Sequence, residues 1–397
     1  MSSEREPSVQ APGQVIPLSV PEIRGSEWRY VKECLDNGWV SSAGAFVERF
    51  EREFASAVGA KHAVATVNGT AALHVALRLA GVETGDEVLV STLTFIAPAN
   101  AIRYVGAWPV FIDAELHFWQ MDPLRVVEWL ERACRWDGRI LTNRTTGRRV
   151  RAIVPVHILG HPVDMDPIVN VAHRYGITVV EDATESLGAT YRGRKVGTIG
   201  EMACFSFNGN KLITTGGGGM IVTDRDDLAA KARYLTTQAK DDLMEFVHEE
   251  IGYNYRLTNI QAALGCAQLE RLDEYLATKR AIAKRYEAGF KNLVGVTLMP
   301  QAPWASSAFW LYTVLIDADQ FGVDSRALMR HLAANGVQSR PLWQPIHRSP
   351  AHRGAPSTDC PVADMLKQSA LSLPCSVGLP AEHQDRVIDL IRGAGKK

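Results

Sequence analysis

The sequence has no long apolar run and no block of basic residues. None of its apolar stretches approaches the length of about 20 residues that a helix needs to cross a bilayer, and the first residues, MSSEREPSVQAPGQ, lack the apolar core of a signal peptide. The 43 basic and 44 acidic residues leave a formal net charge of −1 and are spread along the chain, which disfavours a nucleic-acid partner. We therefore expect a soluble, cytoplasmic protein with neither a membrane nor a nucleic acid as partner.

Cysteine is scarce and unclustered. No C-x-x-C pair and no His–Cys spacing of the kind found in zinc sites occurs in the chain. The six cysteines are Cys34, Cys134, Cys204, Cys266, Cys360 and Cys375. We expect them to be reduced, mostly buried thiols, and we expect no metal site.

The length of 397 residues exceeds what one hydrophobic core usually serves, so two domains are expected. Residues 1–15, rich in Ser, Pro, Glu and Gln, are typical of a flexible tail. Residues 16–256 are predicted to form a large domain, and residues 257–397 a linking helix with a small C-terminal α/β domain. In the linking helix, which is predicted over 257–290, Thr258 and Gln261 have the spacing of a capping box.

Short apolar runs rich in Val and Ile alternate with helical segments in the large domain. They read HAVATV, EVLVST, PVFIDA, RAIVPVH, ITVVEDA, ACFSF and GMIVT. Strands that are apolar on both faces indicate a mostly parallel sheet covered by helices, which is an α/β fold. In such sheets ligands bind at the carboxyl ends of the strands.

The most informative segment is ACFSFNGNKLITTGGGGMIVT, in which a polar, Gly-rich turn holds Lys211 between two apolar runs. Taken alone, a lysine in a tight turn is usually a solvated surface charge. Asp182 ends the run ITVVEDA and should project from the same edge of the sheet. This carboxylate either caps a helix or keeps the pyridine nitrogen of pyridoxal 5′-phosphate (PLP) protonated.

A second segment, VNGTAALHVAL, is suited to binding a phosphate. Gly69 allows a sharp turn, and Thr70 and Ala71 open a helix whose free N–H groups bind anions, unless this is an ordinary capped helix. Ser206 and Asn208, which precede Lys211, are candidates to complete the phosphate site. In LTFIAPANAI, Phe95 is a further candidate. Its ring either stacks on the cofactor or belongs to the hydrophobic core.

These residues match a known pattern: the chain resembles the DegT/StrS-type nucleotide-sugar aminotransferases, PLP-dependent transferases of fold type I. The resemblance spans nearly the whole chain. It rests on IPLSVPEIRGSEW, GWVSSAGAFVERFE, NGTAALHVAL, LTFIAPANAI, HILGHPVDMDPI, VVEDATESLGATYRGRKVGTIG, FSFNGNKLITTGGGGM, GYNYRLTNIQAALG and SRPLWQPIH.

The resemblance implies that Lys211 forms the Schiff base with PLP, that Asp182 pairs with the pyridine nitrogen, and that Phe95 stacks on the ring. It implies that the phosphate is held by Thr70, Ala71 and Ser206. It also implies that Asn254 of GYNYRLT reaches the PLP phosphate of a neighbouring subunit, so that a homodimer shares its active sites.

Two departures from the family pattern concern the cofactor pocket. Glu185 stands where many members have Gln, which puts an unusual charge near the cofactor hydroxyl, and TTGGGG at 214–219 stands where many have TTGEGG. Neither departure touches the lysine chemistry.

The resemblance further implies a reaction in which an amino group passes from L-glutamate to C4 of a UDP- or GDP-linked 4-keto-6-deoxy sugar, including sugars of legionaminic-acid-type pathways, for surface glycan synthesis. Freed Lys211 would serve as the base. The alternatives are an aminotransferase for a 3-keto sugar, a sugar dehydratase, which Lys211 disfavours because a His replaces the lysine there, and a non-catalytic regulatory protein of the same fold.

Candidate sugar or diphosphate contacts lie in SRPLWQPIH, although each residue fits the small-domain core or surface equally well. They are Arg340, Trp343 and His347. In HILGHPVDMD, His157 and His161 are expected to be structural histidines with satisfied hydrogen bonds rather than residues that line a site.

Overall fold

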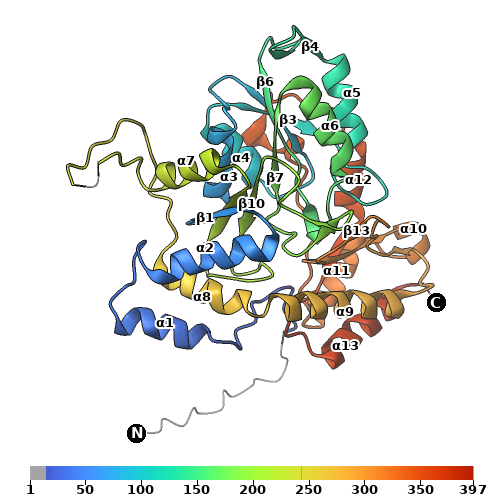
Figure 1. Ribbon diagram of the computed structural model, residues 1–397. Helices are drawn as coiled ribbons and strands as arrows, with labels where there is room; N and C mark the ends of the chain where they lie inside the picture. Colours follow the sequence, from blue (N-terminus) through green and yellow to red (C-terminus); the bar gives the residue numbers. More distant parts are fainter. Residues whose placement is uncertain (1–14, 243, 397) are drawn as a thin grey trace.

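The computed structural model describes residues 15–242 and 244–396, and its centre is one seven-stranded sheet (Figure 1). The strand order is β1-β11-β10-β7-β6-β2-β3, and β11 alone runs antiparallel to its neighbours. The strands are β1 (His62–Thr66), β2 (Glu87–Ser91), β3 (Trp108–Ile112), β6 (Val150–Val154), β7 (Thr178–Asp182), β10 (Met202–Ser206) and β11 (Gly219–Thr223). All seven predicted runs are therefore strands of a mostly parallel sheet, which confirms the predicted α/β fold.

Helices cover both faces of the sheet because alternate side chains of each strand point to opposite faces. In β7, for example, Val180 packs with α3 (Gly69–Leu79), α4 (Ala97–Tyr104) and α7 (Asp226–Thr236), whereas Val179 packs with α5 (Pro123–Arg132) and α6 (Met165–Tyr175). Around β1, β10 and β11, the second face is covered by α2 (Ala45–Val58) and α8 (Asn259–Leu269), and α1 (Glu27–Asp36) lies against α8 (Figure 1).

The segment predicted as one long linking helix is divided into α8 and α9 (Leu272–Phe290). The predicted capping box is present at the start of α8, where Thr258 and Gln261 bond to each other's backbone. At the division the Arg271 N–H bonds to Gln268 O, three residues back, which tightens the last turn and ends the helix before α9 begins.

The C-terminal part of the chain has its own antiparallel sheet, β12-β14-β15, packed on helices. Its core joins α9 to the last helix through apolar side chains such as Tyr286 and Val387. Its elements are β12 (Val296–Thr297), β14 (Tyr312–Ile316), α10 (Ala318–Phe321), α11 (Ser325–Ala334), α12 (Pro361–Ser369), β15 (Ala370–Leu373) and α13 (Ala381–Ala394). The boundary at 256/257 between the two predicted domains stays a prediction.

Smaller elements complete the described chain. They are the hairpin β4 (Cys134–Trp136) and β5 (Leu141–Asn143), the sheet of β8 (Thr190–Tyr191), β9 (Arg194–Lys195) and β13 (Ala305–Ser306), and the short helices η1 (Ile158–Gly160), η2 (Ile346–Arg348) and η3 (Pro350–His352). Residues 1–14 of the predicted flexible tail lie outside the described residues. Within the described ranges, no helix has both the length and the hydropathy that crossing a bilayer requires.

Candidate active site

A cavity of about 370 Å³ opens at the carboxyl ends of the parallel strands. This is the edge at which ligands bind in α/β sheets. Nine of the predicted site residues line it: Gly69, Thr70, Phe95, Asp182, Glu185, Ser206, Asn208, Lys211 and Trp343. The fold thus brings together residues that lie more than 270 positions apart in the sequence.

Lys211 lies in a closed turn between β10 and β11. The turn is fixed by backbone bonds between Phe207 and Gly218 and from the Lys211 N–H to Asn208 O. The Lys211 side chain is only 14% exposed, and its Nζ lies 3.6 Å from Glu185 Oε1 and 4.1 Å from the ring centroid of Trp310. Lys211 is therefore an active-site amine candidate and not a solvated surface charge.

Asp182 is the last residue of β7 and is buried beside the cavity. Its Oδ1 accepts the backbone N–H of Thr184 at 3.1 Å. Burial raises the pKa of Asp182, and this effect is opposed by the Thr184 hydrogen bonds and the positive charge of Lys211. A buried carboxylate of this kind gains from a cationic partner, such as a protonated pyridine nitrogen.

Glu185, the residue that departs from the family pattern, is also buried. Burial raises its pKa to about 7, against the opposing effects of the Lys211 charge and of the Leu159 N–H, which Glu185 Oε2 accepts at 2.8 Å. The group therefore exchanges its proton near neutral pH, which a glutamine at this position cannot do.

The N-terminus of α3 faces the cavity. Asn68 caps this helix, since its Oδ1 accepts the Ala71 N–H at 2.8 Å, and the N–H groups of Gly69 and Thr70 have no acceptor among the described residues. A Cβ on Gly69 would lie 2.9 Å from Ser206 Cβ, so a glycine is needed where α3 approaches β10. The Ala71 N–H, predicted as a phosphate donor, already has a partner, whereas those of Gly69 and Thr70 are free to bind an anion.

Phe95 follows β2 and is 56% exposed at the cavity. An exposed aromatic ring in this position is not part of the core, so the core alternative is wrong. Stacking on the cofactor stays a prediction.

Four predicted residues do not line the cavity. Arg340 and Asn254 are exposed outside the cavity, and the Ala71 N–H is bonded to the Asn68 side chain. His347 bonds through Nδ1 to Thr92 Oγ1 at 2.8 Å, and its Nε2 lies 3.4 Å from Asp364 Oδ1. A role of Asn254 in a neighbouring subunit is a separate prediction.

His161 is a structural histidine, as expected. It is buried, stacks on Phe118, donates from Nδ1 to Pro162 O and accepts the Ala302 N–H at Nε2. Burial lowers its pKa to about 4, so the ring is neutral at physiological pH.

Sequence reasoning missed Trp310, which lines the cavity on the side of Lys211. Its indole Nε1 donates to Asn210 O at 2.7 Å, and its carbonyl accepts from Lys279 Nζ at 2.7 Å. The segment WLYTVLIDA indicates only a strand, and the one available signal is the tryptophan two residues before β14 begins.

Known aminotransferases share the fold and the sequence pattern of this chain. A family model for the DegT/DnrJ/EryC1/StrS aminotransferase family matches residues 21–392, so the chain belongs to this family. It is 42% identical over 374 residues to GDP-perosamine synthase of Caulobacter vibrioides, with 94% of this chain and 96% of that protein covered. It is 34% identical over 394 residues to dTDP-3-amino-3,4,6-trideoxy-alpha-D-glucose transaminase of Streptomyces venezuelae, with 98% and 97% covered.

A solved structure agrees with these relatives. The crystal structure of S. venezuelae DesV in complex with a ketimine intermediate superimposes with a TM-score of 0.84 at 33% identity, covering 94% of this chain and 95% of that one. The protein is therefore an aminotransferase of fold type I, and its cofactor is PLP.

The residues present fit this cofactor. The cavity holds an amine for a Schiff base, a buried carboxylate that could pair with the pyridine nitrogen, and helix N–H groups that have no acceptor among the described residues and could bind a phosphate. When bound, PLP supplies an electron sink that stabilises negative charge on the α-carbon of an amino donor.

Proposed function

We propose that this protein moves an amino group from L-glutamate to C4 of a nucleotide-linked 4-keto-6-deoxy sugar, in amino-sugar and surface glycan synthesis. The observation that carries the amino transfer is the position of the Lys211 amine in the cavity beside Asp182 and Glu185. The sugar class is supported by the 42% identity to a GDP-perosamine synthase, a protein named for a GDP-linked sugar.

Each residue has a definite role in this proposal. Lys211 anchors the cofactor and, once freed, carries a proton between the donor α-carbon and C4′ of the cofactor. Asp182 keeps the pyridine nitrogen protonated. The N–H groups of Gly69 and Thr70, with the Ser206 hydroxyl, bind the phosphate.

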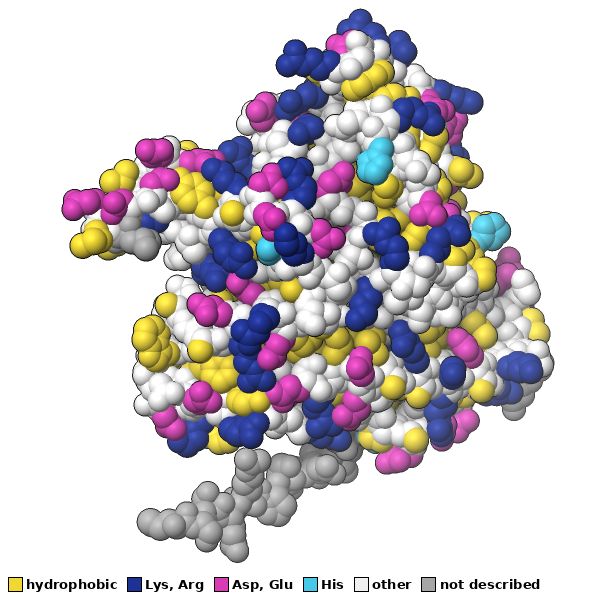
Figure 2. Space-filling view, viewed as in Figure 1, with side chains coloured by type: hydrophobic (Ala, Val, Ile, Leu, Met, Phe, Trp, Pro, Cys, Tyr) yellow, Lys and Arg dark blue, Asp and Glu magenta, His cyan; other side chains and the backbone are white. Residues whose placement is uncertain are grey.

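We also propose a homodimer with shared active sites. The projecting segment, residues 238–242 and 244–252, extends from the body of the protein (Figure 1) and carries exposed apolar and acidic side chains (Figure 2). Met244 and Ile251 on it are 85% and 81% exposed, and Asn254 follows directly after it. Apolar side chains gathered on a projection are typical of a protein contact.

The cytoplasm is the proposed compartment, which the six buried, unpaired cysteines support.

A 3-keto nucleotide sugar is the second candidate substrate. The relative named dTDP-3-amino-3,4,6-trideoxy-alpha-D-glucose transaminase, at 34% identity, favours it. The two candidates differ only in which sugar carbon reaches the Lys211 amine, because the cofactor site is the same for both.

A spectroscopic experiment tests the proposal. Purified holoenzyme should show a visible cofactor band that L-glutamate bleaches, and one sugar from a panel of UDP-, GDP- and dTDP-linked 3-keto and 4-keto sugars should restore it. Restoration by a 4-keto-6-deoxy sugar supports the first candidate, and restoration by a 3-keto sugar supports the second. A protein without a visible band, or one that no amino donor bleaches, would be a binding protein instead.

A further inference from the structure

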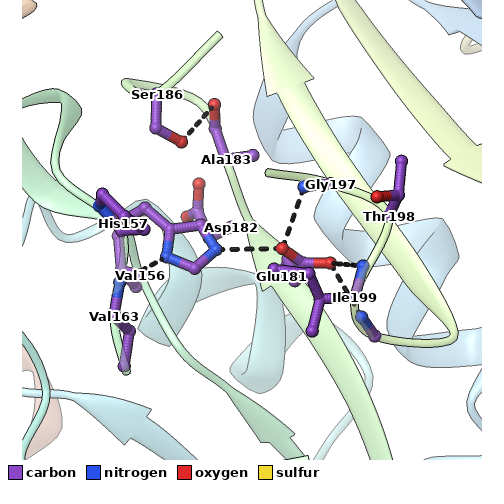
Figure 3. Close-up of polar contacts among 12 residues, drawn as sticks. Val156, His157, Val163, Glu181, Asp182, Ala183, Ser186, Gly197, Thr198 and Ile199 are labelled. Carbon is purple, nitrogen blue, oxygen red and sulfur yellow. Dashed lines mark hydrogen bonds and ion pairs between the residues drawn. The ribbon is translucent and has the colours of Figure 1, made fainter. Parts of the chain in front are cut away.

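A buried hydrogen-bond network lies directly behind the active site. Glu181 precedes Asp182 on β7 and points to the opposite face of the strand, where it is completely buried (Figure 3). Its Oε1 accepts the N–H groups of Ile199 and Gly200 at 2.7 and 2.8 Å, and its Oε2 accepts that of Gly197 at 2.9 Å. A buried carboxylate needs this many donors to stay ionised.

His157 supplies the fourth donor to Glu181. Its Nδ1 accepts the Val163 N–H at 3.0 Å, so Nδ1 carries no proton and the ring proton is on Nε2. Nε2 lies 3.1 Å from Glu181 Oε2 and therefore donates to it (Figure 3). Burial favours the protonated carboxyl, but the His157 hydrogen bond and the backbone donors hold the pKa of Glu181 below its usual value. The pair is thus joined by a hydrogen bond from His157 Nε2–H to the Glu181 carboxylate.

The pair fixes the turn 157–163, and this turn contacts the active site. The His157 N–H bonds to Asp182 O at 3.0 Å, which aligns the start of the turn with the end of β7. Two residues on, Leu159 adopts a left-handed backbone with φ of 60°, and its N–H is donated to Glu185 Oε2 at 2.8 Å. The other oxygen of Glu185 faces Lys211 at 3.6 Å.

The same turn also contacts the segment that carries Trp310. Gly160 O accepts the Ala308 N–H at 2.9 Å and the Ser307 hydroxyl at 3.0 Å. A Cβ on Gly160 would lie 2.7 Å from Trp310 N, so the turn and this segment are in close contact. Two side chains that contact Lys211 therefore depend on one turn.

We propose that His157 and Glu181 form a positioning pair for the catalytic centre, which holds the turn 157–163 so that the Leu159 N–H keeps the Glu185 carboxylate facing the Lys211 amine. Neither residue lines the cavity, so both act through other residues. The inference rests on the proposed function of Lys211 as the amine that anchors the cofactor and carries the proton in the same site.

Two substitutions of His157 separate this role from a general loss of stability. His157→Asn keeps an oxygen near the position of Nδ1 for Val163 and loses the donor to Glu181, whereas His157→Gln keeps the donor near the position of Nε2. Glu181→Gln breaks the same link from the other side, should His157→Asn fail to fold. The matched control is Glu87→Gln, which changes another fully buried carboxylate, bound by Asn143 and Thr146 at the opposite edge of the sheet.

Hydrogen exchange of the full-length protein, with and without PLP, gives a readout that does not depend on activity. In His157→Asn and Glu181→Gln, the Leu159 amide should exchange about tenfold faster than in the wild type, because the turn that directs this N–H to Glu185 is no longer held in place. In His157→Gln and Glu87→Gln its exchange should stay within about threefold of wild type.

A double-mutant cycle with the holoenzyme tests whether His157 acts through Glu185. In the otherwise wild-type protein, His157→Asn should slow the bleaching of the cofactor band by the amino donor about tenfold and leave the half-saturating donor concentration unchanged. In a Glu185→Ala background, the same substitution should slow bleaching less than about twofold. The proposal is overturned if the Leu159 amide of His157→Asn and Glu181→Gln exchanges at the wild-type rate, or if His157→Asn and Glu87→Gln change this exchange equally. It is also overturned if His157→Asn slows bleaching as much in the Glu185→Ala background as in the otherwise wild-type protein. If no amino donor bleaches the wild-type band, the proposed function fails, and the exchange comparison still decides on the pair.

Discussion

The Lys211 ammonium lies over the face of the Trp310 ring, 4.1 Å from its centroid. A cation in this position is attracted by the negative charge of the ring face. Because Trp310 is itself tied to Asn210 and Lys279, the ring is a fixed wall of the cavity. Trp310, which is about 100 positions from Lys211 in the sequence, thereby limits where the Lys211 amine can lie.

Replacing Trp310 should disorder the amine without removing it. We expect Trp310→Leu to lower the rate of the reaction with the amino donor about tenfold or more, because misplacement of a catalytic group by about an ångström has costs of this order. Trp310→Phe keeps the ring face and loses only the bond to Asn210 O, so it should cost less. Single-turnover bleaching of the cofactor band measures both. Equal losses in the two variants would contradict a role for the ring face.

Removal of the Lys211 amine should abolish function and leave the fold intact. Lys211→Ala should have neither the visible cofactor band nor turnover, since the only amine that lines the cavity among the described residues is gone. Absorption spectra and circular dichroism check the two parts of this expectation. The control is Lys195→Ala, an exposed lysine on β9, which should behave as wild type. Turnover at the wild-type rate in Lys211→Ala would refute the assignment.

The pKa of Glu185 makes stability depend on pH in a direction that can be worked out. In the unfolded chain this carboxyl has its ordinary pKa of 4.5, and in the folded protein its pKa is about 7. Between these values the folded state holds the extra proton, so the stability contributed by this group is complete below about pH 4.5 and is lost as the pH rises through about 7.

Glu185→Gln should remove this dependence. Relative to wild type, the free energy of unfolding of the cofactor-free variant should rise by up to about 3 kcal/mol between about pH 4.5 and pH 8. Urea unfolding at several pH values and one protein concentration measures the difference. In the holoenzyme, the same substitution should flatten any limb of the pH–rate profile near pH 7. A constant difference in stability across this range would contradict a raised pKa at Glu185.

The sequence predicted the parts of the site that depend on strand order. Asp182 and Lys211 could be brought together because each follows an apolar strand and the carboxyl ends of parallel strands share one edge. Trp310 and Leu159 could not be predicted, since the first is placed by contacts between distant segments and the second by a left-handed turn that a leucine does not signal. The break between α8 and α9 was missed for a related reason, because helical periodicity continues across Glu270 and Arg271 although the backbone does not.

Close packing of α3 against β10 makes Gly69 sensitive to substitution. A Cβ there would lie 2.9 Å from Ser206 Cβ, which forces the N-terminus of α3 away from the phosphate site. We expect Gly69→Ala to weaken PLP binding about tenfold or more, because the helix N–H groups no longer point toward the phosphate. Titration of the cofactor-free protein with PLP measures this. Gly209→Ala is the control, because a Cβ on Gly209 meets nothing within 4 Å, and it should bind PLP as wild type does. Unchanged PLP binding by Gly69→Ala would mean that this helix end does not hold the phosphate.

The projecting segment, residues 238–242 and 244–252, provides a test of the proposed dimer. Ile251 is 81% exposed on this segment, three residues before Asn254, and a charge at this position would have to be buried in a subunit contact. Ile251→Glu should therefore shift the molecular mass in solution from dimer toward monomer, measured by light scattering, and should weaken PLP binding if Asn254 contacts the cofactor of the partner subunit. Val294→Glu changes a residue that is 66% exposed after α9 and should leave both properties unchanged. A dimer of Ile251→Glu as stable as the wild-type dimer would place the subunit contact elsewhere.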